Sequence, residues 1–66
     1  MTPKYPHVQV QLSDEDDSAP AIVARCRRAA QHAGIAAVER DNFMREAFSG
    51  DYDNLIATAM AWFDCH

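Results

Sequence analysis

One short segment constrains this chain more than any other: residues 7–12, whose side chains alternate strictly between apolar and polar. The apolar members are Val8, Val10 and Leu12, and the polar members are His7, Gln9 and Gln11. A period of two is typical of a half-buried β-strand. No second clear strand pattern follows, and a single strand cannot satisfy its own backbone hydrogen bonds. The strand therefore needs a partner: residues 62–66 of the same chain, the same strand in a second copy, or another protein.

The rest of the chain has the apolar spacing of helices. We expect helices over about 19–33 and 37–48 and a third from Tyr52, with Gly34 ending the first. We expect the apolar faces to be formed by Ile22, Val23, Cys26, Ala29, Ala30 and Ala33, then Phe43, Met44, Ala47 and Phe48, then Tyr52, Leu55, Ile56, Ala59, Met60 and Phe63. Trp62 falls on an edge of the third face. The expected fold class is α+β, one N-terminal strand followed by three short helices, with residues 63–66 as a candidate second strand.

The chain has the size of one small domain. Its 66 residues, 48% of them apolar, are read as a single unit 1–66 with an irregular lead-in over 1–6 and an acidic loop over 13–18. A core this thin leaves little room for a closed active-site cleft. No Gly-rich loop, nucleophile elbow or phosphate cradle frames a catalytic group. We therefore expect no enzyme activity, no catalytic residue and no cofactor.

The cysteine content and the lack of long apolar runs indicate in which cellular compartment the protein works. Two cysteines, Cys26 and Cys65, are too few for a disulfide framework and favour a reducing environment. They and the three histidines lack the close spacing of zinc ligands, so no metal site is expected. No signal peptide is visible, and no apolar run approaches the ~18–20 residues of a membrane span. The expectation is a cytoplasmic protein without a membrane partner.

Carboxylates are the first candidate contact residues. The run Asp14, Glu15, Asp16 and Asp17 is read either as a solvated loop that favours the following helix start or as a contact for a basic protein surface. In the later segment 49–55, SGDYDNL, Ser49 and Gly50 end one helix and Asp51 caps the next through the N–H of Asp53 or Asn54. Whether Asp53 also meets a partner stays open at this point.

A second set of candidates suits nucleic acid. Gln9 and Gln11 on the exposed strand face, with Arg25 and Arg28 on the first helix, would match a ribbon-helix-helix plan, in which strands from two subunits pair and enter the major groove. The net charge of −4, the absence of Lys or Arg in the strand and the third helix argue against a large nucleic-acid footprint. A homodimer paired through residues 8–12 and binding DNA is therefore the alternative, not the leading interpretation.

The order of these features resembles an uncharacterised family of small proteins encoded by tailed phages, plasmids and bacterial genomes. The resemblance rests on Val8-x-Val10-x-Leu12, Ala33-Gly34-Ile35, Phe43-x-x-Glu46-Ala47-x-Ser49-Gly50-Asp51-Tyr52-Asp53-x-Leu55-Ile56-x-Thr58 and Trp62. The chain departs from the family at residues 14–18, where the relatives carry a Gly/Asn turn. The resemblance implies the setting of a mobile-element accessory protein rather than a reaction. The leading expectation is an acidic interaction module that binds and inhibits a host protein or a nucleic-acid-handling defence complex.

Overall fold

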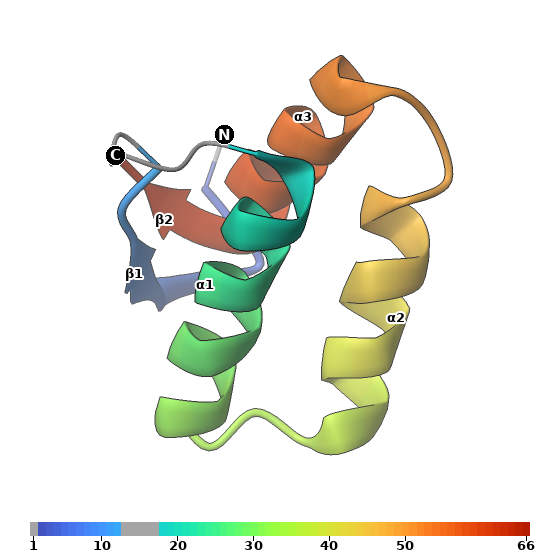
Figure 1. Ribbon diagram of the computed structural model, residues 1–66. Coiled ribbons are helices and arrows are strands. Elements are labelled where there is room, and N and C mark those ends of the chain that lie inside the picture. The colour runs from blue at the N-terminus through green and yellow to red at the C-terminus, as the bar shows by residue number, and fades with distance from the viewer. Residues whose placement is uncertain (1, 13–17) are drawn as a thin grey trace.

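The strand over residues 7–12 finds its partner within the chain. The computed structural model describes residues 2–12 and 18–66, in the order β1 (Tyr5–Val10), α1 (Ala19–His32), α2 (Ala37–Ala47), α3 (Tyr52–Trp62) and β2 (Phe63–Cys65). β1 and β2 form a two-stranded parallel sheet, so the two ends of the chain lie side by side (Figure 1). The expected α+β fold, including its short C-terminal strand, is confirmed. Among the described residues, no helix is both long and apolar enough to cross a membrane.

The β1–β2 ladder is irregular in its first half. Its register pairs Tyr5 with Phe63, Gln9 with Asp64 and Val10 with Cys65. The stretch of β1 between the first two pairs contains Pro6, which has no N–H to donate to a ladder. β1 thus begins two residues earlier than predicted, inside the expected lead-in. The two chain segments stay hydrogen-bonded beyond the ends of both strands. The Leu12 N–H donates to the His66 carbonyl at 2.6 Å.

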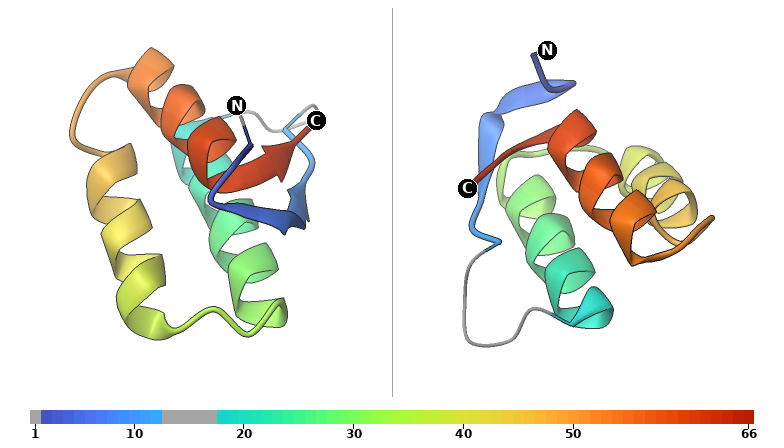
Figure 2. Two further views of the ribbon diagram at one scale, coloured as in Figure 1. Left: turned by 180° about the vertical axis from the view of Figure 1, so that it is seen from behind. Right: turned by 90° about the horizontal axis from the view of Figure 1, so that it is seen from above.

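The core lies between the sheet and the helices. The predicted alternation of β1 is confirmed, since Val8 and Val10 are buried whereas the polar residues between and beside them are exposed. The sheet sits on the side of α1 and α3 that faces away from α2, as both views of the molecule from front and back show (Figures 1 and 2). α2 in turn packs on α1 and α3. α1 and α3 therefore cover the apolar face of the sheet, and α2 closes the core from the other side of these two helices.

Aromatic rings occupy the centre of the core. Phe43 of α2 meets the rings of Trp62 and Phe63 edge-on, with centroid distances of 5.6 and 5.0 Å. The Trp62 indole N–H donates to a carboxylate oxygen of Glu46 at 3.1 Å, which satisfies its polar atom. The Lys4 ammonium lies 4.3 Å from the centroid of the same indole. Trp62, expected on the edge of the third apolar face, is thus a buried junction between α2, α3 and the N-terminal segment.

Four residues assigned to the apolar faces are exposed instead: Ala33, Phe48, Tyr52 and Met60. Met60 is 57% exposed because α3 turns the side chains of Leu55, Thr58, Ala59 and Trp62 inward. Phe63 was counted on the same helical face, but it leaves the helix and enters the core from β2. Ala33, Phe48 and Tyr52 lie at or just beyond helix ends, where the neighbouring helices no longer cover them.

The predicted end of α1 at Gly34 is confirmed by a Schellman motif. Gly34 has a φ of 81°, in the left-handed region that favours glycine. Its N–H donates to the Gln31 carbonyl at 3.1 Å, and the Ile35 N–H donates to the Ala30 carbonyl at 3.0 Å. Ile35 and Ala30 are both buried, which adds the apolar contact common to this motif. The turn fixes where the chain leaves α1 and starts α2.

The SGDYDNL segment is a helix–helix junction, as predicted. The Ser49 hydroxyl donates to the Glu46 carbonyl at 2.7 Å, and an Asp51 carboxylate oxygen accepts from the Asn54 N–H at 2.9 Å. The Asn54 side chain also donates to the Glu46 carbonyl, at 3.1 Å. The segment therefore ties the end of α2 to the start of α3.

Replacing Asp51 by alanine removes the cap of α3. We expect the free energy of unfolding to fall by about 1 kcal/mol, the typical value for losing an N-cap side chain. Asp51→Asn keeps an acceptor oxygen and should stay close to the wild-type protein. Urea unfolding followed by circular dichroism measures both. Equal stability of Asp51→Ala and the wild-type protein would show that the cap contributes nothing.

Candidate functional site

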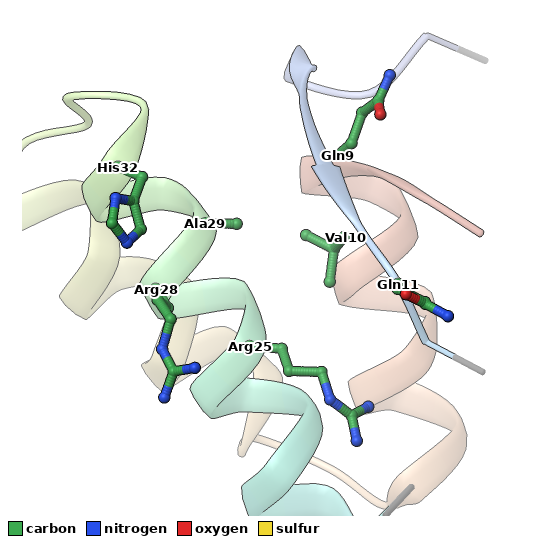
Figure 3. A pocket seen from close by; sticks show the side chains of 7 residues that line it. All are labelled: Gln9, Val10, Gln11, Arg25, Arg28, Ala29 and His32. Carbon is green, nitrogen blue, oxygen red and sulfur yellow. The ribbon is translucent and has the colours of Figure 1, made fainter. Parts of the chain in front are cut away.

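A shallow groove runs between β1 and α1. Its volume is about 270 Å³, and its lining residues are Gln9, Val10, Gln11, Arg25, Arg28, Ala29 and His32 (Figure 3). Buried Val10 and half-buried Ala29 give it an apolar floor, whereas the other side chains are polar or cationic. We call this feature the β1–α1 groove.

The two walls of the groove follow from the periods of their elements. On β1, the alternation that buries Val10 places Gln9 outward, and Gln11, the residue just after the strand, is exposed as well. On α1, side chains three and four residues apart share a face, which aligns Arg25, Arg28 and His32 along the groove. Figure 3 shows Arg25 reaching from α1 toward the end of β1, where its guanidinium is 3.5 Å from the Leu12 carbonyl oxygen. Cationic side chains thus line one wall and carboxamides lie along the other.

The groove gathers the second set of sequence candidates. Gln9, Gln11, Arg25 and Arg28 come from two separate segments of the chain, and all four line this one groove. His32 joins them, one turn of helix beyond Arg28. Guanidinium groups can bind carboxylates or phosphates, and the neighbouring carboxamides can form hydrogen bonds with polar groups such as the edges of nucleic-acid bases. The arrangement suits an anionic partner.

The candidate carboxylates are not among the described residues that line the groove. Asp14, Glu15, Asp16 and Asp17 lie outside the described residues, so their role stays a prediction. Asp53 is exposed in the first turn of α3, far along the chain from the groove-lining residues.

Charge is unevenly distributed along the chain. Six of the ten acidic residues lie in the described part and balance the six Lys and Arg residues, so the net charge of −4 equals that of residues 14–17. Three of the six basic residues, Arg25, Arg27 and Arg28, are on α1, which carries no carboxylate. α1 therefore forms a cationic element in a protein whose total charge is negative.

The thiols are held in their neutral form. Cys26 is fully buried, and burial, with a smaller contribution from the nearby Cys65, raises its pKa to about 12. Burial and the charge of Asp64 raise the pKa of Cys65 to about 11, and its Sγ lies 3.2 Å from the Ala59 carbonyl oxygen. Both groups are poor nucleophiles at neutral pH, because the thiolate is the reactive form. Both serve the core in the same way as small apolar residues.

These pKa values predict an alkaline limit to stability. The unfolded chain loses its thiol protons near pH 9, whereas the folded chain keeps them until about pH 11–12. The unfolded state then binds fewer protons, so the free energy of unfolding falls as the pH rises above about 9. Urea midpoints between pH 7 and 10.5 measure the decline. In the double variant Cys26→Ala/Cys65→Ala, the urea midpoint should fall less steeply with pH. A pH profile identical to that of the wild-type protein would contradict the prediction.

Other potential ligands are dispersed. Within residues 2–12 and 18–66, no group of three or more His, Cys, Asp or Glu side chains lies close enough to hold a metal ion. His7 packs its ring edge-on against Tyr5, at a centroid distance of 6.2 Å. His32 and His66 lie at the end of α1 and after β2.

Arg27, Arg28 and Gln31 mark a basic side of α1 in the sequence, but sequence reasoning did not find two surface depressions. The first is a depression on a neighbouring face of α1, lined by Ala24, Arg27, Arg28, Gln31 and Arg40. The second is an apolar depression beside α3 that includes Met60, which had been assigned to the core. The adjacent Arg27 and Arg28 were a signal for the first, but nothing in the linear pattern placed Arg40 beside them.

Comparisons of the chain with protein-family models, with curated proteins and with solved structures find no match.

Proposed function

We propose that this protein is a non-enzymatic interaction module that binds and modulates a partner protein. The β1–α1 groove supports the proposal, because it combines an apolar floor with the exposed side chains of Gln9, Gln11 and Arg28 and the half-buried Arg25. Such a surface suits an acidic segment of the partner, whose carboxylates would meet Arg25 and Arg28. Binding rather than chemistry also suits a chain with so thin a core.

The proposed setting is a mobile genetic element. The resemblance of the strand, the SGDYDNL junction and Trp62 to small phage and plasmid proteins supports this setting. The proposed partner is a host protein or a nucleic-acid-handling defence complex, which the module would inhibit by occupying a surface. The carboxylates at 14–17 and Asp53 are proposed as a second contact, for a basic region of the same partner.

The groove variant Gln9→Glu with Arg25→Glu tests this proposal. It reverses the charge of the groove while leaving the buried residues intact. The control, Arg45→Glu, changes an exposed arginine of α2 outside the groove. In affinity capture from a host lysate, followed by quantitative mass spectrometry, we expect the groove variant to lose the partner and the control to retain it. Equal capture by both variants, or capture of no partner by the wild-type protein, would contradict the proposal.

A second candidate function is DNA binding by a strand-paired homodimer. The observation that favours it is the convergence of Gln9, Gln11, Arg25 and Arg28 on one groove. Because β2 pairs with one edge of β1, a second copy would have to pair along the other edge. Sedimentation should then show a dimer, and a random duplex should be shifted at low salt. A monomer that shifts no duplex even at low salt rejects this candidate.

A further inference from the structure

The depression between α1 and α2, which borders the groove at Arg28, carries three guanidinium groups. Its volume is about 220 Å³, and Arg27 and Arg28 of α1 line it together with Arg40 of α2, with Gln31 and Ala24 beside them. Arg27, Arg28 and Gln31 are exposed on successive turns of α1. We call this feature the arginine depression.

Arg40 is held in place before any ligand arrives. Its guanidinium donates to the Ile35 carbonyl at 2.6 Å, and the side chain is half-buried. Ile35 is itself fixed by the Schellman turn, through its N–H bond to Ala30 and its burial in the core. A guanidinium has five N–H donors, so Arg40 keeps donors for a ligand after this bond is made.

The positive charges of the arginine depression are not neutralised within the described part of the chain. There, no carboxylate forms an ion pair with Arg27, Arg28 or Arg40, and the carboxylate of Glu39 instead binds Lys4 at 3.0 Å. Gathering like charges in one place raises their mutual repulsion. A bound anion would offset the electrostatic repulsion among the three guanidinium groups.

We propose that the arginine depression binds a phosphate group that carries two negative charges. Guanidinium groups match phosphate oxygens in paired hydrogen bonds, and the Gln31 amide can add one more donor. The volume is large enough for a phosphate, and the open side leaves room for a group attached to it. A dianion neutralises more of the three positive charges than the single charge of a phosphodiester. This site is independent of the β1–α1 groove function, although Arg28 borders both.

Titration with inorganic phosphate at constant ionic strength, followed by ¹H–¹⁵N NMR, tests the proposal. We expect saturable shifts in the signals of Arg27, Gln31 and Arg40, which sodium chloride does not produce. Arg27→Gln should raise the Kd at least about fivefold, because a charge-assisted hydrogen-bond donor is lost. Arg40→Gln should do the same. Arg45→Gln removes the same charge from α2 outside the depression and should leave the Kd unchanged.

Two results would overturn the proposal. One is a phosphate response that does not saturate, or that Arg45→Gln weakens as much as Arg27→Gln does. The other comes from a parallel titration with a short single-stranded oligonucleotide that lacks terminal phosphates. If the oligonucleotide shifts the same arginine signals while inorganic phosphate does not, the ligand is a phosphodiester strand. Neither result bears on partner capture, which is tested by variants at Gln9 and Arg25.

Discussion

The Phe43→Ala variant is expected to lose a large share of its free energy of unfolding and to unfold at a much lower temperature than the wild-type protein. Phe43 is 1% exposed and contacts the rings of both Trp62 and Phe63, so alanine would leave a cavity at the meeting point of α2, α3 and β2. Phenylalanine-to-alanine changes in cores cost about 3–5 kcal/mol. At roughly 0.05–0.15 kcal/mol per residue, a domain of this length has only about 3–10 kcal/mol of stability. One substitution therefore removes a large share of it.

Phe48→Ala is the matched control, because the same chemical change falls on a side chain that is 52% exposed. We expect it to cost less than about 1 kcal/mol. Thermal and urea unfolding, followed by circular dichroism, compare the two variants. Similar losses in both would mean that Phe48, not only Phe43, is packed in solution, and would contradict the arrangement of α2.

Removal of residues 63–66 should abolish cooperative folding. The truncation removes Phe63, which is 2% exposed, and all three residues of β2 that pair with β1. The hydrogen bond from the Lys4 N–H to the Ala61 carbonyl, just before β1, would remain. Val8 and Val10 would lose the strand beside them, and the backbone groups of β1 that face β2 would have no protein partner. The expected product has weak helical circular dichroism and no sharp unfolding transition.

The full-length variant Phe63→Ala separates packing from strand pairing. It keeps the β1–β2 ladder and loses only the aromatic side chain, so it should be destabilised but still unfold cooperatively where its stability allows. Asp64→Ala, an exposed position of β2, should behave as the wild-type protein does. A truncated chain that folds with wild-type cooperativity would show that β1 does not need β2.

Local signals predicted the elements well. The alternation of residues 7–12, the glycine after α1 and the aspartate before α3 each act through neighbours only a few residues away. Gly34 is needed where the backbone turns left-handed, and Asp51 needs only the N–H of Asn54. Each of these signals depends only on a short stretch of chain, and the structure confirms all three predictions.

The candidate surfaces were predicted only in part. Gln9, Gln11, Arg25 and Arg28 could be chosen because they are polar residues on exposed faces, but their meeting in one groove depends on how β1 packs against α1. The arginine depression was predicted only in part for a related reason, because its α1 side is visible in the sequence but Arg40 is not placed beside it. Arg40 is twelve residues from Arg28 along the chain, and it is the turn at Gly34 and Ile35 that brings it alongside.

The sequence by itself determined one strand, three helices and where the first and third helices are capped, because backbone geometry and side-chain period act over a few residues. Only the tertiary structure decided what completes the strand. Residues 63–65 pair with β1 in parallel because three helices intervene and return the chain to the same side of the molecule. Packing also decided that Trp62 is buried while Met60 is exposed, since the rotation of α3 is set by the whole core and not by its own apolar spacing.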